Sequence, residues 1–106
     1  MGWAMTEVVR SYRLLKKYDI KKPEYLKFSK KLADFALRDF NPSYGFAKTW
    51  NRDGSPRKKD GTVGGFMIMG LIEVYRETHE EKYLELSKKA MDFYYERDLD
   101  HFLCMA

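Results

Sequence analysis

YLKFSKKLADF at residues 25–35 returns 58 positions later as YLELSKKAMDF at residues 83–93. Seven of the eleven columns are identical. In both copies the apolar residues recur at the three- and four-residue steps of an amphipathic helix. A repeat of this period is typical of stacked supersecondary units. The two stretches therefore predict a duplicated helical unit.

Each copy has a second amphipathic helix in front of it. In the first copy, a periodic apolar stripe predicts a leading helix over residues 4–18. Pro23 then stands where its missing N–H does no harm, and it opens a trailing helix over residues 23–40. The short connection between the helices implies antiparallel neighbours. Residues 4–40 are thus predicted to form helical hairpin one.

The second copy follows the same plan over residues 62–98. Its leading helix is predicted at 62–78, and Thr78-x-x-Glu81 has the pattern of a capping box for a trailing helix at about 80–97. The whole chain is therefore predicted to be a single all-α domain of two tandem helical hairpins.

The two leading helices are expected inside and the two trailing helices outside. From Phe66 to Tyr75 the residues are almost all apolar, and a helix that is apolar on every side is normally buried on every side. The trailing helices carry Lys, Glu and Asp along one side, which favours contact with water there. Two layers follow.

A long connection, residues 41–61, joins the hairpins, and connections of this length usually carry a function. Within it, residues 44–50 read as a strand, Asp53-Gly54 as a tight turn and residues 55–59 as a returning strand. We expect a small β-hairpin here.

Composition excludes several classes of function. The net charge of +4 comes from interspersed acidic and basic residues, which favours solvated helix faces over a nucleic-acid interface. The apolar stretch 66–72 is too short for a membrane span. The single cysteine, Cys104, allows no intramolecular disulfide, and with no signal peptide visible the default compartment is the cytoplasm. Two histidines and one cysteine offer no ligand spacing, so neither a metal nor a cofactor is expected.

Three stretches resemble a known architecture: GFAKTWNRDGSP at 45–56, GLIEVYRET at 70–78 and EKYLELSKKA at 81–90. They are similar to the (α/α)6 toroids, which include the six-hairpin glycosidases and the N-acylglucosamine 2-epimerase-like proteins. The resemblance covers residues 5–98. A ring of six such units has roughly 350 residues, so this chain corresponds to about two of the six hairpins.

The resemblance implies a carbohydrate-active toroid enzyme, glycoside hydrolase-like and acting on oligosaccharides. The chain alone is then an inactive part of the ring. Its uncovered inner helices are expected to drive self-association. The alternative is a helical-repeat module that binds a protein or peptide without catalysis.

In toroids of this kind the loops that enter the inner helices line a central cleft, so the long loop is the expected sugar site. Tyr44 and Trp50 are candidates to stack on a sugar ring, and Arg52 is a candidate to grip a carboxylate. Asp53 and Asp60 are candidate catalytic carboxylates.

Each candidate has a structural alternative. Asp53 is favoured in an Asp-Gly turn for its backbone conformation alone. Asp60 precedes a helix entrance, where a carboxylate stabilises the positive end of the helix dipole. Trp50 is also explained by packing over the end of a helix.

Overall fold

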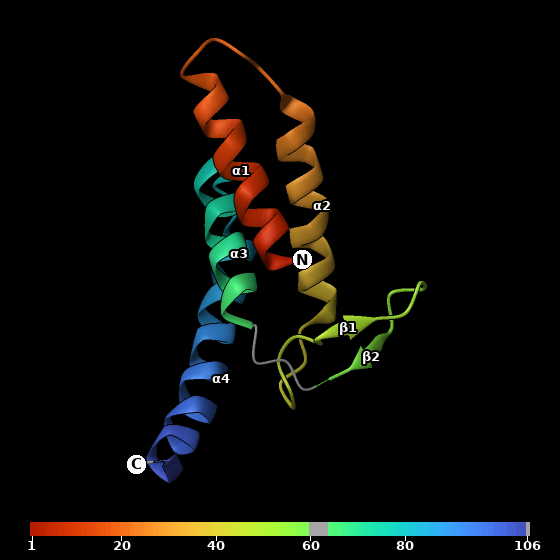
Figure 1. Ribbon diagram of the computed structural model, residues 1–106, viewed down its shortest axis with the longest axis vertical. Helices are drawn as coiled ribbons and strands as arrows, with labels where there is room; N and C mark the ends of the chain where they lie inside the picture. Colours follow the sequence, from red (N-terminus) through yellow and green to blue (C-terminus); the bar gives the residue numbers. More distant parts are fainter. Residues whose placement is uncertain (60–63, 106) are drawn as a thin grey trace.

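The computed structural model of the chain describes residues 1–59 and 64–105, with side chains at 1–59 and 66–97. This part of the chain is mostly helical: four α-helices, with a short antiparallel two-stranded hairpin between the two helix pairs (Figure 1). The elements in chain order are α1 (Gly2–Lys16), α2 (Pro23–Asp39), β1 (Thr49–Trp50), β2 (Pro56–Lys58), α3 (Gly64–Thr78) and α4 (Glu81–Met105).

The helix boundaries follow local chemistry. Pro23 is the first residue of α2, as predicted, because its fixed φ suits the first turn. Both connections within a helix pair pass through a residue with positive φ, Asp19 at 61° and His79 at 58°. The His79 N–H donates to the Tyr75 carbonyl at 2.7 Å, which closes the last turn of α3.

The predicted capping box is wrong in its hydrogen bonds. The Thr78 hydroxyl donates to the Val74 carbonyl at 2.9 Å and accepts from the N–H of Glu80 at 3.3 Å, not from that of Glu81. The Glu81 carboxylate instead accepts a hydrogen bond from the Tyr75 hydroxyl at 3.3 Å. Thr78 therefore ends α3, and α4 begins at Glu81.

The two leading helices, α1 and α3, run parallel and pack against each other more extensively than any other pair (Figure 1). At their N-terminal ends the backbones nearly touch, since a Cβ on Gly2 would lie 2.4 Å from the Met67 nitrogen. Towards their C-terminal ends, Arg13 forms ion pairs of 2.8 Å with both Glu73 and Glu77. Gly2 at one end of this contact and the ion pairs of Arg13 at the other fix the register of α1 against α3.

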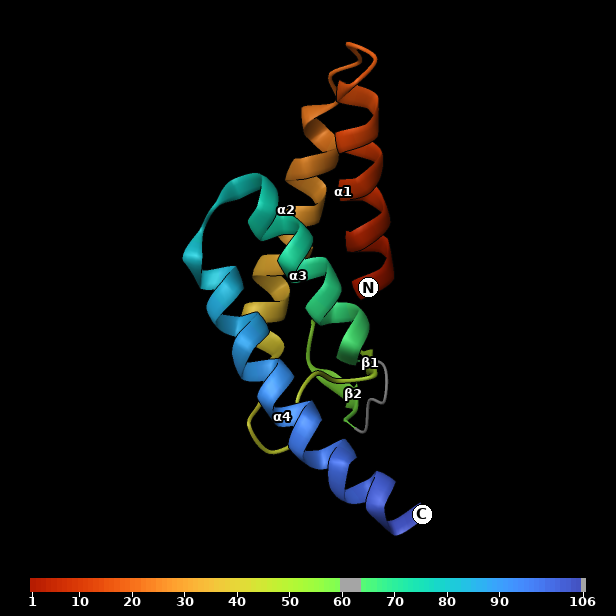
Figure 2. The ribbon, with the colours of Figure 1, turned by 90° about the vertical axis from the view of Figure 1, so that its left-hand side faces the viewer.

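The trailing helices lie along one side of this pair. Each contacts its own leading helix, and α2 also touches α3 and α4 (Figure 2). The Tyr83 hydroxyl of α4 donates to the Asp34 carboxylate of α2 at 2.5 Å, and burial first, then this carboxylate, raises the Tyr83 pKa. The repeated serines, Ser29 and Ser87, are both buried and both donate to a backbone carbonyl. Their partners differ, however, because Ser29 donates to the Met5 carbonyl of α1 whereas Ser87 donates to the Tyr83 carbonyl within α4.

The core lies between the two layers. Its fully buried members include Met5, Val9, Leu71, Val74 and Tyr83. Met5 and Val9 belong to the predicted stripe of the first leading helix and Tyr83 to the repeated stretch, whereas Leu71 and Val74 belong to the apolar stretch from Phe66 to Tyr75.

The leading helix of hairpin two is not buried on every side. Phe66 and Met69 are 46% and 45% exposed, so the expectation for the whole Phe66–Tyr75 stretch is wrong at these two positions. Phe66 is covered in part by Trp3, whose ring stacks on it with centroids 6.0 Å apart, and both side chains still reach the surface.

Other boundaries differ by a few residues. The predicted helix at 62–78 falls partly outside the described residues, and α3 is seen from Gly64. The trailing helix predicted to end near 97 continues to Met105. The strands are only two and three residues long, and their pairing register shifts between Thr49 and Trp50.

Candidate functional site

The β-hairpin is built by its turn. The Asn51 N–H donates to the Ser55 carbonyl at 2.9 Å, and Gly54 supplies the positive φ of 90° that the turn needs. Asp53 accepts hydrogen bonds from the Ser55 N–H at 2.9 Å and the Ser55 hydroxyl at 2.6 Å. These bonds lower the Asp53 pKa, so this exposed carboxylate is ionised and engaged within the turn.

Asp39, the last residue of α2, holds the hairpin in place. One of its oxygens accepts from the Trp50 indole Nε1–H at 2.8 Å, and the other accepts from the Ala47 N–H at 3.1 Å. The Trp50 ring also meets Phe35 edge-on at 5.5 Å between centroids. The indole therefore has one fixed orientation.

A second anchor fixes the start of the loop to α4. The Phe46 N–H donates to the Tyr94 hydroxyl at 2.8 Å, and the Phe46 ring is buried against Tyr94. Gly45 has a φ of 83°, and a Cβ there would lie 2.4 Å from the Tyr94 hydroxyl oxygen. Only glycine allows the backbone to pass this close to α4.

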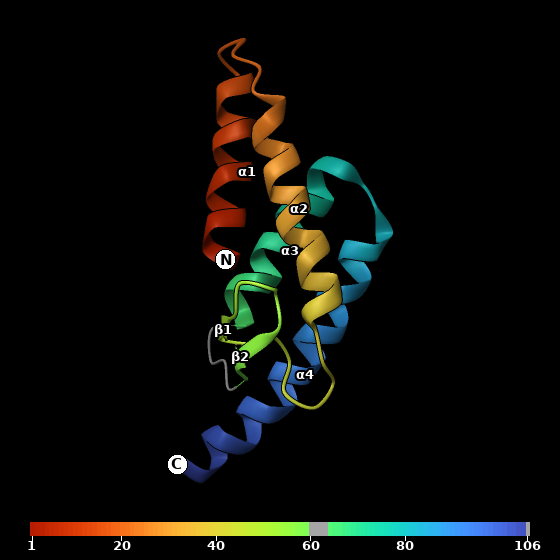
Figure 3. The same ribbon diagram turned by 90° about the vertical axis from the view of Figure 1, so that its right-hand side faces the viewer.

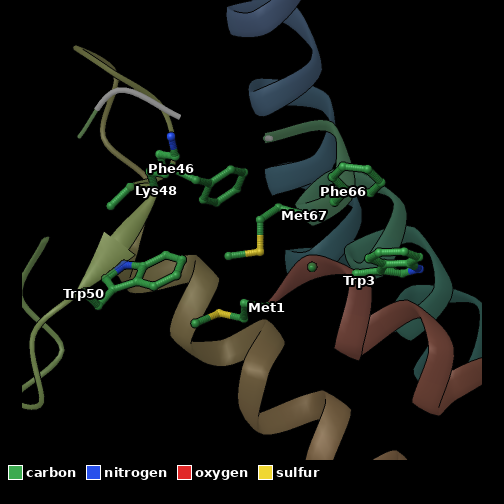
Figure 4. A pocket seen from close by; sticks show the side chains of 9 residues that line it. Met1, Trp3, Phe46, Lys48, Trp50, Phe66 and Met67 are labelled. Atoms are coloured by element: carbon green, nitrogen blue, oxygen red, sulfur yellow. The ribbon is translucent and has the colours of Figure 1, made fainter. Parts of the chain in front are cut away.

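Between these anchors and the N-terminal ends of α1 and α3 lies a pocket of about 240 Å³, here called the aromatic pocket (Figure 4). Its walls include Met1, Trp3, Phe46, Trp50, Phe66 and Met67. Figure 4 shows Met67 between Trp50 on one side and the pair of Trp3 and Phe66 on the other. Those two rings stack with centroids 6.0 Å apart. Both tryptophans of the chain therefore line one pocket.

A second cavity of about 320 Å³, here called the polar cavity, lies between the end of α2 and the β-hairpin turn. Its polar lining residues are Arg38, Asp39, Asn41, Tyr44 and Asp53. Asp39 thus lines the polar cavity while it orients Trp50 in the wall of the aromatic pocket. The two cavities are linked through this one hydrogen bond.

The structure separates the five residues named from the sequence. Trp50 lines the aromatic pocket, whereas Tyr44 and Asp53 line the polar cavity. Arg52 is exposed in the turn and belongs to the lining of neither. Asp60 lies outside the described residues.

Sequence reasoning missed Trp3 and Asp39. Trp3 lies 38 residues before the loop begins at residue 41, and Asp39 belongs to no motif, so the loop sequence pointed to neither. An aromatic residue on the first turn of a leading helix, next to the expected cleft, was the available sign for Trp3.

In the described part of the chain no group of three or more His, Cys, Asp and Glu side chains is placed to hold a metal ion. Within the same residues no helix combines the length and the apolar character that crossing a membrane requires. Comparison of the chain with protein-family models, with curated proteins and with solved structures found no match.

Proposed function

We propose that the chain is a carbohydrate-binding part of an (α/α) toroid enzyme, and that the aromatic pocket receives a sugar unit of an oligosaccharide. The observation that carries the proposal is the convergence of both tryptophans, from β1 and α1, on one pocket beside the long loop. Indole faces are the side-chain surfaces best suited to the apolar face of a pyranose ring.

The orientation of Trp50 strengthens this reading. Asp39 accepts the Trp50 Nε1–H at 2.8 Å, and Phe35 meets the ring edge-on, so the plane of the indole is held before a ligand arrives. A preorganised surface loses less conformational freedom on binding, which favours affinity.

The volume and lining limit the ligand. Pockets for drug-sized ligands usually measure roughly 300–1,000 Å³, so a pocket of about 240 Å³ suits one ring of a longer chain. Among the described residues of the lining, Lys48 is the charged one, and it offers hydrogen-bond donors to hydroxyl or carboxylate oxygens.

The reaction assigned to the complete ring is glycoside hydrolysis, which uses two carboxylates. The lowered pKa of Asp53 suits an ionised base or nucleophile, not a general acid. Asp60 keeps its candidate role as the second carboxylate, and this chain alone is inactive in the proposal.

The test is a titration of the chain with neutral and uronate-containing oligosaccharides, followed by tryptophan fluorescence. Because the only two indoles line the pocket, a bound sugar is expected to change the emission in a saturable way. Trp50→Ala is expected to weaken binding about fivefold or more, since stacking on an aromatic ring contributes about 1 kcal/mol or more.

Tyr95→Ala is the matched control, because it removes an aromatic ring that is 66% exposed on α4 and lines no part of the pocket. It is expected to leave the affinity unchanged. The absence of a saturable change with every sugar, or equal weakening by both substitutions, would refute the proposed site.

A further inference from the structure

One side of α1 carries an exposed stripe that the proposed sugar site does not use in full. Its members are Trp3, Glu7, Arg10 and Leu14, and the two apolar ones are 66% and 56% exposed. At 100° per residue these four positions fall within a sector of about 60°. Figures 2 and 3 show α1 at one edge of the molecule, with no other element beyond it.

The spacing of the stripe has a specific geometry. Steps of four, three and four residues are the spacing of the a and d positions of a two-stranded coiled coil, with apolar residues here at the two ends and charged residues at the two central positions. The rest of α1 is already in use, since Met5 and Val9 are fully buried in the core. The stripe is therefore a separate surface, suited to packing against another helix.

The order of the four side chains makes the stripe complementary to the same stripe running in the opposite direction. A twofold axis between residues 8 and 9 of two antiparallel α1 helices brings Trp3 opposite Leu14 of the second copy. The same axis brings Glu7 opposite Arg10 of the second copy. Each end then makes an apolar contact, and the centre makes two pairs of opposite charge.

We propose that a second copy of this chain docks on this stripe, with the two α1 helices antiparallel around a twofold axis. Within one chain the Glu7–Arg10 pair is long, at 3.9 Å, and both side chains are more than half exposed, so both remain open to a closer partner. A parallel pair would instead place Glu7 against Glu7, which is unfavourable. Such a self-complementary patch is the defining property of a twofold interface.

Phe66 extends the apolar ends of the interface. It stacks on Trp3 and is itself 46% exposed, so each end of the pair presents two aromatic rings to Leu14 of the other copy. The second copy would therefore cover part of the α3 surface that the core leaves exposed.

The test uses Glu7→Arg and Arg10→Glu, measured by sedimentation velocity and native mass spectrometry. The unmodified chain is expected to form a dimer with rising concentration. Each single variant is expected to weaken dimerisation at least tenfold, because like charges then meet at the centre. An equimolar mixture of the two variants is expected to form a heterodimer, since the basic pair of one chain faces the acidic pair of the other.

Lys31→Glu is the matched control, because it makes a charge change of the same size as Arg10→Glu on the exposed side of α2. It is expected to leave dimerisation unchanged. A chain that stays monomeric at millimolar concentration, or variants that fail to form the heterodimer while their circular dichroism shows folded helices, would overturn the proposal. Glu7 and Arg10 do not line the aromatic pocket, so the two variants test dimerisation without removing a residue of the proposed sugar site.

Discussion

A single carboxylate organises the candidate site. Both oxygens of Asp39 accept a hydrogen bond, one from the Trp50 indole and one from the Ala47 backbone. A carboxylate at the end of α2 is unfavourable for the helix dipole, because the C-terminal end of a helix carries partial negative charge. The two hydrogen bonds to Ala47 and Trp50 offset this cost and tie the hairpin to the helix.

The hydrogen bonds of Asp53 lead to a prediction about pH. The Ser55 hydrogen bonds hold the Asp53 pKa below its ordinary value of 3.8. A depressed pKa stabilises the folded turn above the unfolded value, and this stabilisation is lost as the pH falls through the lowered pKa. The amide NMR signal of Ser55 is therefore expected to titrate at a pH below 3.8.

Asp53→Asn is the control, because the amide oxygen still accepts the Ser55 bonds but has no charge to lose. The Ser55 signal of this variant is expected to stay constant with pH. A titration of the unmodified chain at or above 3.8 would contradict the assigned bonding.

At the scale of the elements, the contact between α1 and α3 joins the two helical hairpins. Arg13 connects Glu73 and Glu77, and the Glu73 side chain is only 10% exposed. Glu73 has a further partner in Arg76 at 3.2 Å, but that guanidinium is 58% exposed. Arg13 is thus the main counter-charge for a carboxylate inside the interface.

Arg13→Met is expected to destabilise the fold by about 2–3 kcal/mol, because it leaves Glu73 buried with only an exposed partner. Urea unfolding followed by circular dichroism measures the change. Arg76→Met removes the exposed partner alone and is expected to cost less than about 1 kcal/mol. Equal costs for the two variants would contradict the ranking.

The helices themselves could be predicted because their signals are local. The stripe spacing and Pro23 depend only on neighbours in sequence, and both were confirmed. The exposure of Phe66 and Met69 could not be predicted, because a helix that is apolar on every side does not say which neighbours cover it. The β-strands were predicted too long for a similar reason: the extent and register of pairing across the hairpin, which shifts between Thr49 and Trp50, do not follow from either strand alone.

Part of the lining of the aromatic pocket could be predicted. An indole in a long loop stands out in the sequence, and Trp50 lines the aromatic pocket; its role as a sugar-binding residue stays a prediction. Tyr44 and Asp53 lie in the other cavity, and Trp3 joins the pocket only because α1 and α3 meet at their N-terminal ends. That meeting is a property of packing between distant helices, which no local pattern encodes.

At the scale of the whole molecule, the two layers of helices place the loop over the N-terminal ends of the leading pair. The aromatic pocket forms where α1, α3 and the β-hairpin meet, so it requires both helical units and the connection between them. The proposed sugar site is therefore a product of the duplication.

The most direct measurement of this claim is a ¹H–¹⁵N NMR titration that follows the two indole N–H signals. Trp3 and Trp50 give the only two such signals, and Trp50 is identified by its sensitivity to Asp39→Asn. Binding of an oligosaccharide in the pocket is expected to shift both signals together, with the same saturation, while the amide of Tyr95 stays in place. Saturating sugar that leaves both indole signals unmoved would contradict the account.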